Sequence, residues 1–292
     1  MSFDNAKAYL EGNTYTMSYT KVLMENYGGW IEWCEDGRDS LLDIGSGPGS
    51  AIKEAVYPLL PANFSKCVLS DISPLMVEMQ KKVFSGLSGV SCEILDIGNE
   101  ISEKQLHRIG TFDHITSFFC LMWVADQQKA MDNIYKLLKP GGDCFLVIMA
   151  DSLIIDVLLS VCIKPRWRDC LAGWENFYVY PYTQIDNAKA KALQFMKNAG
   201  FVETKAELIR KPFDFSTDKE MEKFLRGFPT KFSRDVTENE KEEIFQERLK
   251  YMDKYVVGNF RDNEGRIHKP NVDLVLYGKK NKFSAASRTQ RA

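Results

Sequence analysis

The residues with the clearest capacity for chemistry form a glycine-rich turn. It follows the apolar segment 41–44 and reads Asp43-Ile44-Gly45-Ser46-Gly47-Pro48-Gly49. Glycines between a strand and a helix let the backbone pass close to a ligand, and the N-terminus of the helix adds a favourable dipole. The spacing therefore indicates a ligand site at this turn.

Two further carboxylates follow the next strand-like segments. Asp71 comes after the apolar run 67–69, and Asp96 comes after the segment 91–95. A carboxylate at the end of the second strand can hold both hydroxyls of a ribose, and Asp96 would lie close to an adenine. Because ligands bind at the carboxyl edge of an open parallel sheet, the turn, Asp71 and Asp96 are expected to meet there.

The turn departs from a dinucleotide site in two places. A G-x-G-x-x-G pattern that starts at Gly45 would need glycine at position 50, where the chain has Ser50. Pro48 also removes an amide that a pyrophosphate could use. The form D-x-G-x-G-x-G instead resembles class I methyltransferases that use S-adenosylmethionine, which leaves nicotinamide or flavin binding strongly disfavoured.

Strands and helices alternate through the first half of the chain. Strands are expected at 41–44, 67–69, 91–95, 112–119 and 144–149, and a helix at 15–33 precedes them. Ser73 is a natural N-cap, and Pro74 suits the first helical position. The proline and glycines at 139–142 are expected to end a helix before the strand at 144–149. This alternation predicts an α/β fold with a mostly parallel sheet and helices on both faces.

The second half is less regular. It contains an aromatic-rich stretch at 151–182, a helix at 186–199, a strand at 201–209, charged helices near 217–225 and 238–256, and a last strand at 272–280. Phe245, Leu249, Met252 and Val256 share the expected apolar face of the second charged helix. We expect one domain over 1–280, with an N-terminal helical cap at about 1–36, a cofactor-binding core at about 40–150, inserts on the substrate side at about 151–185 and 215–258, and a disordered tail at 281–292.

Composition restricts the function classes. The 292 residues carry a net charge of −2, which argues against a protein that coats nucleic acid. No apolar run approaches the roughly 20 residues that span a bilayer, and the N-terminus lacks the pattern of a signal peptide. The seven cysteines form no CxxC pair, which predicts free thiols in a reducing compartment, a cytoplasmic location and no structural metal site.

Longer motifs narrow the resemblance. LLDIGSG at 41–47, FDHITSF at 112–118 with Leu121 and Trp123 after it, KPGGDC at 139–144 and VDLVLYGKK at 272–280 occur together. With the two-helix insert before the last strand, they resemble the arthropod juvenile hormone acid O-methyltransferase family over about residues 9–280. The resemblance implies a class I methyltransferase fold with an antiparallel last strand, S-adenosylmethionine as cofactor and a hydrophobic carboxylic acid as acceptor.

The resemblance also implies roles for individual residues of the cofactor site. It places Asp43, Gly45 and Gly47 at the methionine half of the cofactor, Asp71 at the ribose, Ile72, Asp96 and Ile97 at the adenine, Phe118 near the sulfonium, and Tyr9 and Asn13 over the cofactor. Simpler interpretations stay open for Asp43, which could cap the turn, and for Ile97, which could be core. His114, inside a strand, is expected to be a satisfied histidine and not a base.

The acceptor end shows two departures from the family. Trp123 would wall the acceptor pocket, although it could also be a packed core tryptophan. The family usually has L-H-W where this chain has Met122 before Trp123. A family glutamine thought to hold the acceptor carboxylate aligns with Thr16, or with Met17 one position on, and neither replaces an amide donor well.

A carboxylic acid is already ionised at neutral pH, so its methylation needs no general base. That fits a sequence with three histidines and no base constellation. We expect a cytosolic small-molecule methyltransferase, monomeric or homodimeric, that acts on a farnesoic or juvenile hormone acid. The alternatives are another small acid or amine acceptor, a family member that binds the cofactor without catalysis, and a macromolecular substrate, for which the balanced charge is unfavourable.

Overall fold

The computed structural model describes residues 6–183, 185–212, 217–233, 235–254 and 270–283. Within these residues seven strands form one sheet in the order β3-β2-β1-β4-β5-β7-β6. The strands are β1 (Ser40–Ile44), β2 (Lys66–Asp71), β3 (Val90–Ile94), β4 (Phe112–Phe118), β5 (Leu138–Asp151), β6 (Val202–Pro212) and β7 (Pro270–Lys279).

Strands β1 to β5 pair in parallel, and β7 lies antiparallel to both β5 and β6. The helices are α1 (Ala6–Gly12), α2 (Thr14–Tyr27), α3 (Ser50–Ala55), α4 (Pro74–Val83), α5 (Glu103–Ile109), α6 (Gln127–Leu137), α7 (Leu153–Cys162), α8 (Ile185–Ala199), α9 (Asp218–Gly227) and α10 (Glu238–Met252). The expected α/β fold, with a mostly parallel sheet and an antiparallel last strand, is confirmed.

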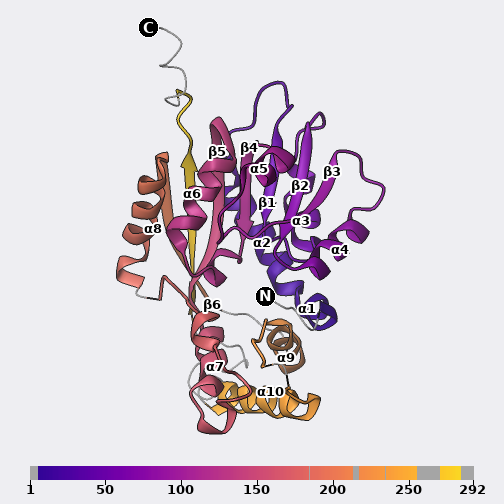
Figure 1. The fold of residues 1–292 in the computed structure, drawn as a ribbon, viewed down its shortest axis with the longest axis vertical. Coiled ribbons are helices and arrows are strands. Elements are labelled where there is room, and N and C mark those ends of the chain that lie inside the picture. Colours follow the sequence, from indigo (N-terminus) through magenta and orange to yellow (C-terminus); the bar gives the residue numbers. More distant parts are fainter. Residues whose placement is uncertain (1–5, 184, 213–216, 234, 255–269, 284–292) are drawn as a thin grey trace.

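Alternating side chains divide the core into two layers. In β5, Leu146 and Ile148 belong to the cluster that includes α6 and α8, whereas Phe145 and Val147 belong to the cluster that includes α2 and α3. Successive residues of a strand point to opposite faces, so an unbroken apolar strand needs helices on both sides. Figure 1 shows the sheet between these two sets of helices.

Helices α1, α7, α9 and α10 gather at one end of the sheet (Figure 1). Helix α7 packs on α10, and α1 packs on α9. Figure 1 shows α7, α9 and α10 together beyond the strands, with α1 beside α9. In the described part of the chain, no helix is both long enough and apolar enough to cross a membrane. The elements that differ most from regular α/β alternation thus surround the end of the sheet where the glycine turn lies.

Three expectations about elements need correction or fall outside the described residues. Strand β5 begins at Leu138, because the backbone at Gly141 and Gly142 hydrogen-bonds with Lys280 instead of ending the strand region. Phe245 and Met252 are buried on α10 as expected and Leu249 packs partly buried against the core, but the buried face also includes Ile244 and Arg248, which were not expected there. Val256 and most of the expected tail, 284–292, lie outside the described residues.

Candidate functional site

One pocket of about 560 Å³ lies where the carboxyl ends of β1, β2 and β4 meet α1 and the segment after α9. This size suits a small-molecule site. The structure brings eleven of the twelve residues singled out from the sequence into its lining: Tyr9, Asn13, Thr16, Gly45, Gly47, Asp71, Ile72, Asp96, Ile97, Phe118 and Trp123. Asp43 is not part of the lining.

A side chain would clash at Gly45 and would fit tightly at Gly47. Gly45 has φ +71° and Gly47 has φ +56°, a region that glycine adopts without strain. A Cβ atom on Gly45 would lie 2.1 Å from the Cys120 Sγ atom, and one on Gly47 would lie 3.3 Å from the Tyr9 hydroxyl. The two glycines therefore let Cys120 and Tyr9 approach the turn closely where it lines the pocket.

Asp71 connects this turn to the next strand. Its Oδ2 accepts the Gly47 amide at 3.0 Å, and its Oδ1 accepts the Ser73 amide at 2.9 Å. Burial raises the pKa of Asp71, while these amide hydrogen bonds oppose the rise. Each carboxylate oxygen keeps a second lone pair, so Asp71 can still accept hydrogen bonds from a diol in the pocket.

Asp43 lies behind the turn. It is 1% exposed, and its Oδ1 accepts the Thr116 hydroxyl at 2.6 Å. Burial raises the pKa of Asp43 to about 7, against the lowering effect of hydrogen bonds from Thr116 and Ser46. This position fits support of the turn, and direct contact with a cofactor stays a prediction.

Helices α1 and α2 and Asn13 between them contribute to the pocket lining. Asn13 is 5% exposed, lines the pocket, and leaves its Oδ1 atom without a hydrogen-bond partner among the described residues. Burial raises the pKa of the Tyr9 hydroxyl, and the nearby Asp71 adds to the effect. An orphaned acceptor beside an open glycine cradle fits a ligand that carries an amine or hydroxyl donor, as S-adenosylmethionine does.

The opposite wall suits a flat, partly polar ring. Asp96 turns its carboxylate onto the Gly98 amide at 2.9 Å and the Asn99 side chain at 2.7 Å. Ile72 and Ile97 lie beside it in the lining, and Ile97 is also part of the core. The interpretation of Ile97 as core and its interpretation as a pocket wall are thus both compatible with the structure.

Aromatic rings form the other end of the pocket. Trp123 is half-buried, with its ring centroid 5.7 Å from Phe177, 5.6 Å from Tyr180 and 6.3 Å from Phe228. Trp123, Phe177 and Phe228 line the pocket, as does Thr16 on α2. This end offers an apolar surface to a second small molecule.

Phe119, next to Phe118, also lines the pocket, and the sequence analysis did not identify four further lining residues: Phe224, Phe228, Pro229 and Lys231. Phe119 has φ +53°, an uncommon conformation for a bulky residue, and such outliers concentrate at functional sites. No local signal marks that conformation. Phe224 and Phe228 carry the spacing of an amphipathic helix end, but only the packing of α9 on α1 brings them to the pocket.

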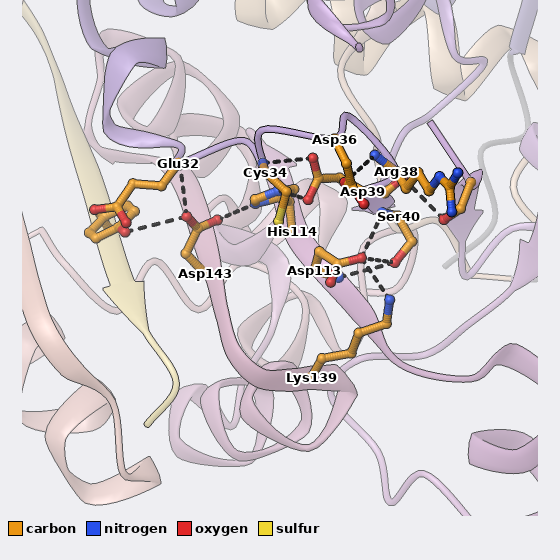
Figure 2. Close-up of polar contacts among 12 residues, drawn as sticks. Glu32, Cys34, Asp36, Arg38, Asp39, Ser40, Asp113, His114, Lys139 and Asp143 are labelled. Carbon is orange, nitrogen blue, oxygen red and sulfur yellow. Dashed lines mark hydrogen bonds and ion pairs between the residues drawn. The ribbon is translucent and has the colours of Figure 1, made fainter. Parts of the chain in front are cut away.

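His114 lies near the amino end of the central strand β4, away from the carboxyl ends of the strands that line the pocket. It is 3% exposed, its Nδ1 is 2.7 Å from the Asp143 Oδ1, and its Nε2 is 3.3 Å from the Asp39 Oδ1. Figure 2 shows the imidazole between the two carboxylates. Burial lowers the pKa of His114, but Asp143 and Asp39 raise it by more, and the net shift is upward. The expected buried histidine is thus paired through Nδ1, whereas its Nε2 lies near Asp39 without a hydrogen bond to a described residue, and its lack of a base role stays a prediction.

We expect His114→Gln to slow methyl transfer less than tenfold, below the 10²–10⁴ that a general base contributes. Because the pKa of His114 is raised in the folded state, protonated His114 stabilises the fold fully below pH ~6.5. This stabilisation is lost as the pH rises through the pKa of His114 in the folded protein. The variant should therefore lose on the order of 3 kcal/mol of unfolding free energy at pH 6, and less at pH 9. Urea unfolding at both pH values and a single-turnover rate measure this. A pH–rate limb that disappears in the variant would contradict it.

Comparisons with known proteins agree with this geometry. A methyltransferase-domain family matches residues 42–144. Juvenile hormone acid O-methyltransferase of Drosophila melanogaster is 33% identical over 211 residues, 72% of this chain and 70% of the relative. The enzyme of the same name from Bombyx mori is 28% identical over 198 residues, 68% of this chain and 69% of the relative.

Solved structures support the fold. The YcgJ protein of Bacillus subtilis matches with a TM-score of 0.56 at 16% identity and covers 91% of this chain and 100% of its own. A putative methyltransferase of Bacillus halodurans matches with a TM-score of 0.54 at 16% identity, over 90% of this chain and 99% of its own.

The described residues contain no group of three or more potential metal ligands.

Proposed function

Because this chain belongs to the methyltransferase family that includes the juvenile hormone acid O-methyltransferase of Drosophila melanogaster, we propose that it methylates the carboxylate of a hydrophobic, isoprenoid-type acid. S-adenosylmethionine is the cofactor. Farnesoic acid or a juvenile hormone acid is the favoured acceptor. The observation that carries the proposal is that one and the same pocket is lined by the glycine turn, by Asp71 and by Trp123 at its aromatic end.

The cofactor would lie with its ribose at Asp71, its adenine between Ile72 and Ile97, and its methionine half over Gly45 and Gly47. Asn13 and Tyr9 would cover it. When bound, it supplies a methyl group on a positively charged sulfur with a good, neutral leaving group. The residues around Phe118 then have to bring an acceptor oxygen into line with that methyl group, which is mainly a task of proximity and orientation.

In the proposed reaction a carboxylate oxygen forms a bond to the methyl carbon while the carbon–sulfur bond breaks. The products are a methyl ester and S-adenosylhomocysteine, and no proton is released because the acceptor is already ionised. Aromatic faces such as that of Trp123 favour a nearby sulfonium. No histidine occurs among the described residues that line the pocket, in agreement with chemistry that needs no base.

An amine acceptor is the second candidate, because Asp126 joins the aromatic rings in the lining. An ammonium group can bind against aromatic faces and a carboxylate. It must lose a proton before it can attack, however, and the Asp126 Oδ1 already accepts the Lys129 amide at 2.9 Å as the N-cap of α6. The acid therefore remains the better supported acceptor.

An acceptor panel with one carbon skeleton separates these readings. Farnesoic acid, the matching primary amine and the matching alcohol should be compared at saturating S-adenosylmethionine. The proposal expects the highest kcat/KM for the acid. A higher value for the amine would support the second candidate, and binding of S-adenosylmethionine without turnover of any acceptor would support a non-catalytic role.

Thr16 offers a direct test of the acceptor contact. It lines the pocket on α2, and its short side chain carries one hydroxyl donor. We expect Thr16→Gln to raise kcat/KM for farnesoic acid about tenfold, the value of one added hydrogen bond to a charge. Affinity for S-adenosylmethionine should not change. If the parent already methylates farnesoic acid efficiently and Thr16→Gln leaves kcat/KM unchanged, the idea that Thr16 leaves the acceptor carboxylate short of a donor is wrong.

A further inference from the structure

We propose that Lys231 is the cationic group that selects and holds the acceptor carboxylate, an inference that rests on the proposed function. Four charged residues line the pocket within the described part of the chain: Asp71, Asp96, Asp126 and Lys231. An acid that enters meets three carboxylates and a single cation. Lys231 is exposed and forms no ion pair with a described residue, so its ammonium is available to a ligand.

The position of Lys231 follows from the segment that carries it. Gly227 lies against Tyr9 of the N-terminal helix, on the cofactor side. Phe228 then packs near Trp123, with ring centroids 6.3 Å apart. The Pro229 carbonyl accepts the Tyr178 hydroxyl at 3.1 Å. The chain thus runs from the cofactor side past the aromatic rings, and Lys231 follows Pro229 by two residues and lines the same pocket.

A buried arginine holds this segment from behind. Arg248 on α10 is 3% exposed, and its Nη1 donates to the Thr230 hydroxyl at 2.7 Å. Its Nε and Nη2 atoms have no hydrogen-bond partner among the described residues. Arg248 therefore anchors Thr230, the residue that precedes Lys231, and adds a second positive charge close to this segment.

The chemistry of an ammonium suits this task. A carboxylate in an apolar pocket needs a donor, and Thr16 supplies only one short hydroxyl. The side chain of lysine is long and carries three donors, so it can reach a carboxylate from the rim of the pocket. The ligand class that fits is a monocarboxylate on a long apolar chain, with the chain along Phe177 and Phe228 and the charge shared between the sulfonium and Lys231.

Binding measurements on the protein loaded with S-adenosylhomocysteine test this directly. The probes are farnesoic acid and its methyl ester, which differ in charge. We expect Lys231→Met to weaken binding of the acid ten- to a hundredfold and binding of the ester less than twofold. Lys231→Arg should retain most of the acid affinity. Lys219→Met, an exposed lysine of α9 outside this lining, should change neither.

Each outcome separates this inference from the proposed function. Equal acid affinity in Lys231→Met and in a parent that methylates the acid would overturn the inference and leave the function intact. Weaker binding of S-adenosylmethionine in Lys231→Met would overturn it too, because Lys231 would then serve the carboxylate of the cofactor. A parent that binds and methylates no acid, but methylates the amine, would overturn the proposed function, and the inference with it.

Discussion

Asp71→Ala should weaken binding of S-adenosylmethionine ten- to more than a hundredfold. The carboxylate is 5% exposed, lines the pocket and is the proposed acceptor for the ribose hydroxyls. Loss of charge-assisted hydrogen bonds costs about 1.5–3 kcal/mol, and the loss of the acceptor for the Gly47 amide adds to it. Burial raises the pKa of Asp71, so the carboxylate is protonated at a higher pH than an exposed aspartate. As the pH is lowered, the affinity for S-adenosylmethionine should therefore begin to fall earlier than it would with an unshifted carboxylate.

Calorimetry on the parent, Asp71→Ala and Asp113→Ala measures this effect. Asp113 is a useful control because its Oδ2 also accepts a backbone amide, that of Ser40 at 2.8 Å (Figure 2). This contact lies at the amino ends of β1 and β4, outside the pocket lining. Asp113→Ala should leave the dissociation constant for S-adenosylmethionine unchanged. Unchanged affinity in Asp71→Ala would show that the ribose does not lie at this carboxylate.

Gly45→Ala is expected to reduce S-adenosylmethionine affinity at least a hundredfold, or to prevent folding. The added Cβ would lie 2.1 Å from the Cys120 Sγ and 2.4 Å from its Cβ, and φ is +71°. The positive φ alone costs about 1–2 kcal/mol for alanine. The clash must push β1 or the start of the segment after β4 into the pocket, where a cofactor would otherwise lie.

Gly86→Ala is the matched control for the backbone strain. Gly86 has φ +80° with open space around the added Cβ. Both variants carry the strain of a positive φ, so the difference in unfolding midpoint and in cofactor affinity measures the clash. The double variant Gly45→Ala/Cys120→Gly should recover part of the loss. Equal behaviour of the Gly45 and Gly86 variants would refute the steric account.

Much of the core could be predicted because its signals are local. Ser73 accepts the Met76 amide as the N-cap of α4, and Pro74 begins the helix, as the sequence indicates. Strand β5 was predicted to begin later because proline and glycine usually end structure. The pairing of Gly141 and Gly142 with Lys280, far along the chain, outweighs that local preference.

Some residues of the pocket could likewise be predicted from local motifs, and others could not. Gly45, Gly47 and Asp71 could be found because the glycine spacing and the strand ends lie in short segments. Lys231 could not, because its loop has no motif and reaches the pocket only through the contacts of Phe228 and Pro229. The burial of Arg248 on α10 could not be predicted either, because it depends on a contact with Thr230 in another segment and not on the apolar pattern of the helix.

The most direct test of the proposed function follows the methyl group itself. The protein is incubated with S-adenosylmethionine labelled in the methyl group and with farnesoic acid, and the apolar product is extracted and hydrolysed in alkali. We expect extractable label that alkali releases as methanol, which identifies a methyl ester, and an equal amount of S-adenosylhomocysteine. Bound cofactor without extractable label, or label that survives alkaline hydrolysis, would contradict carboxyl methylation.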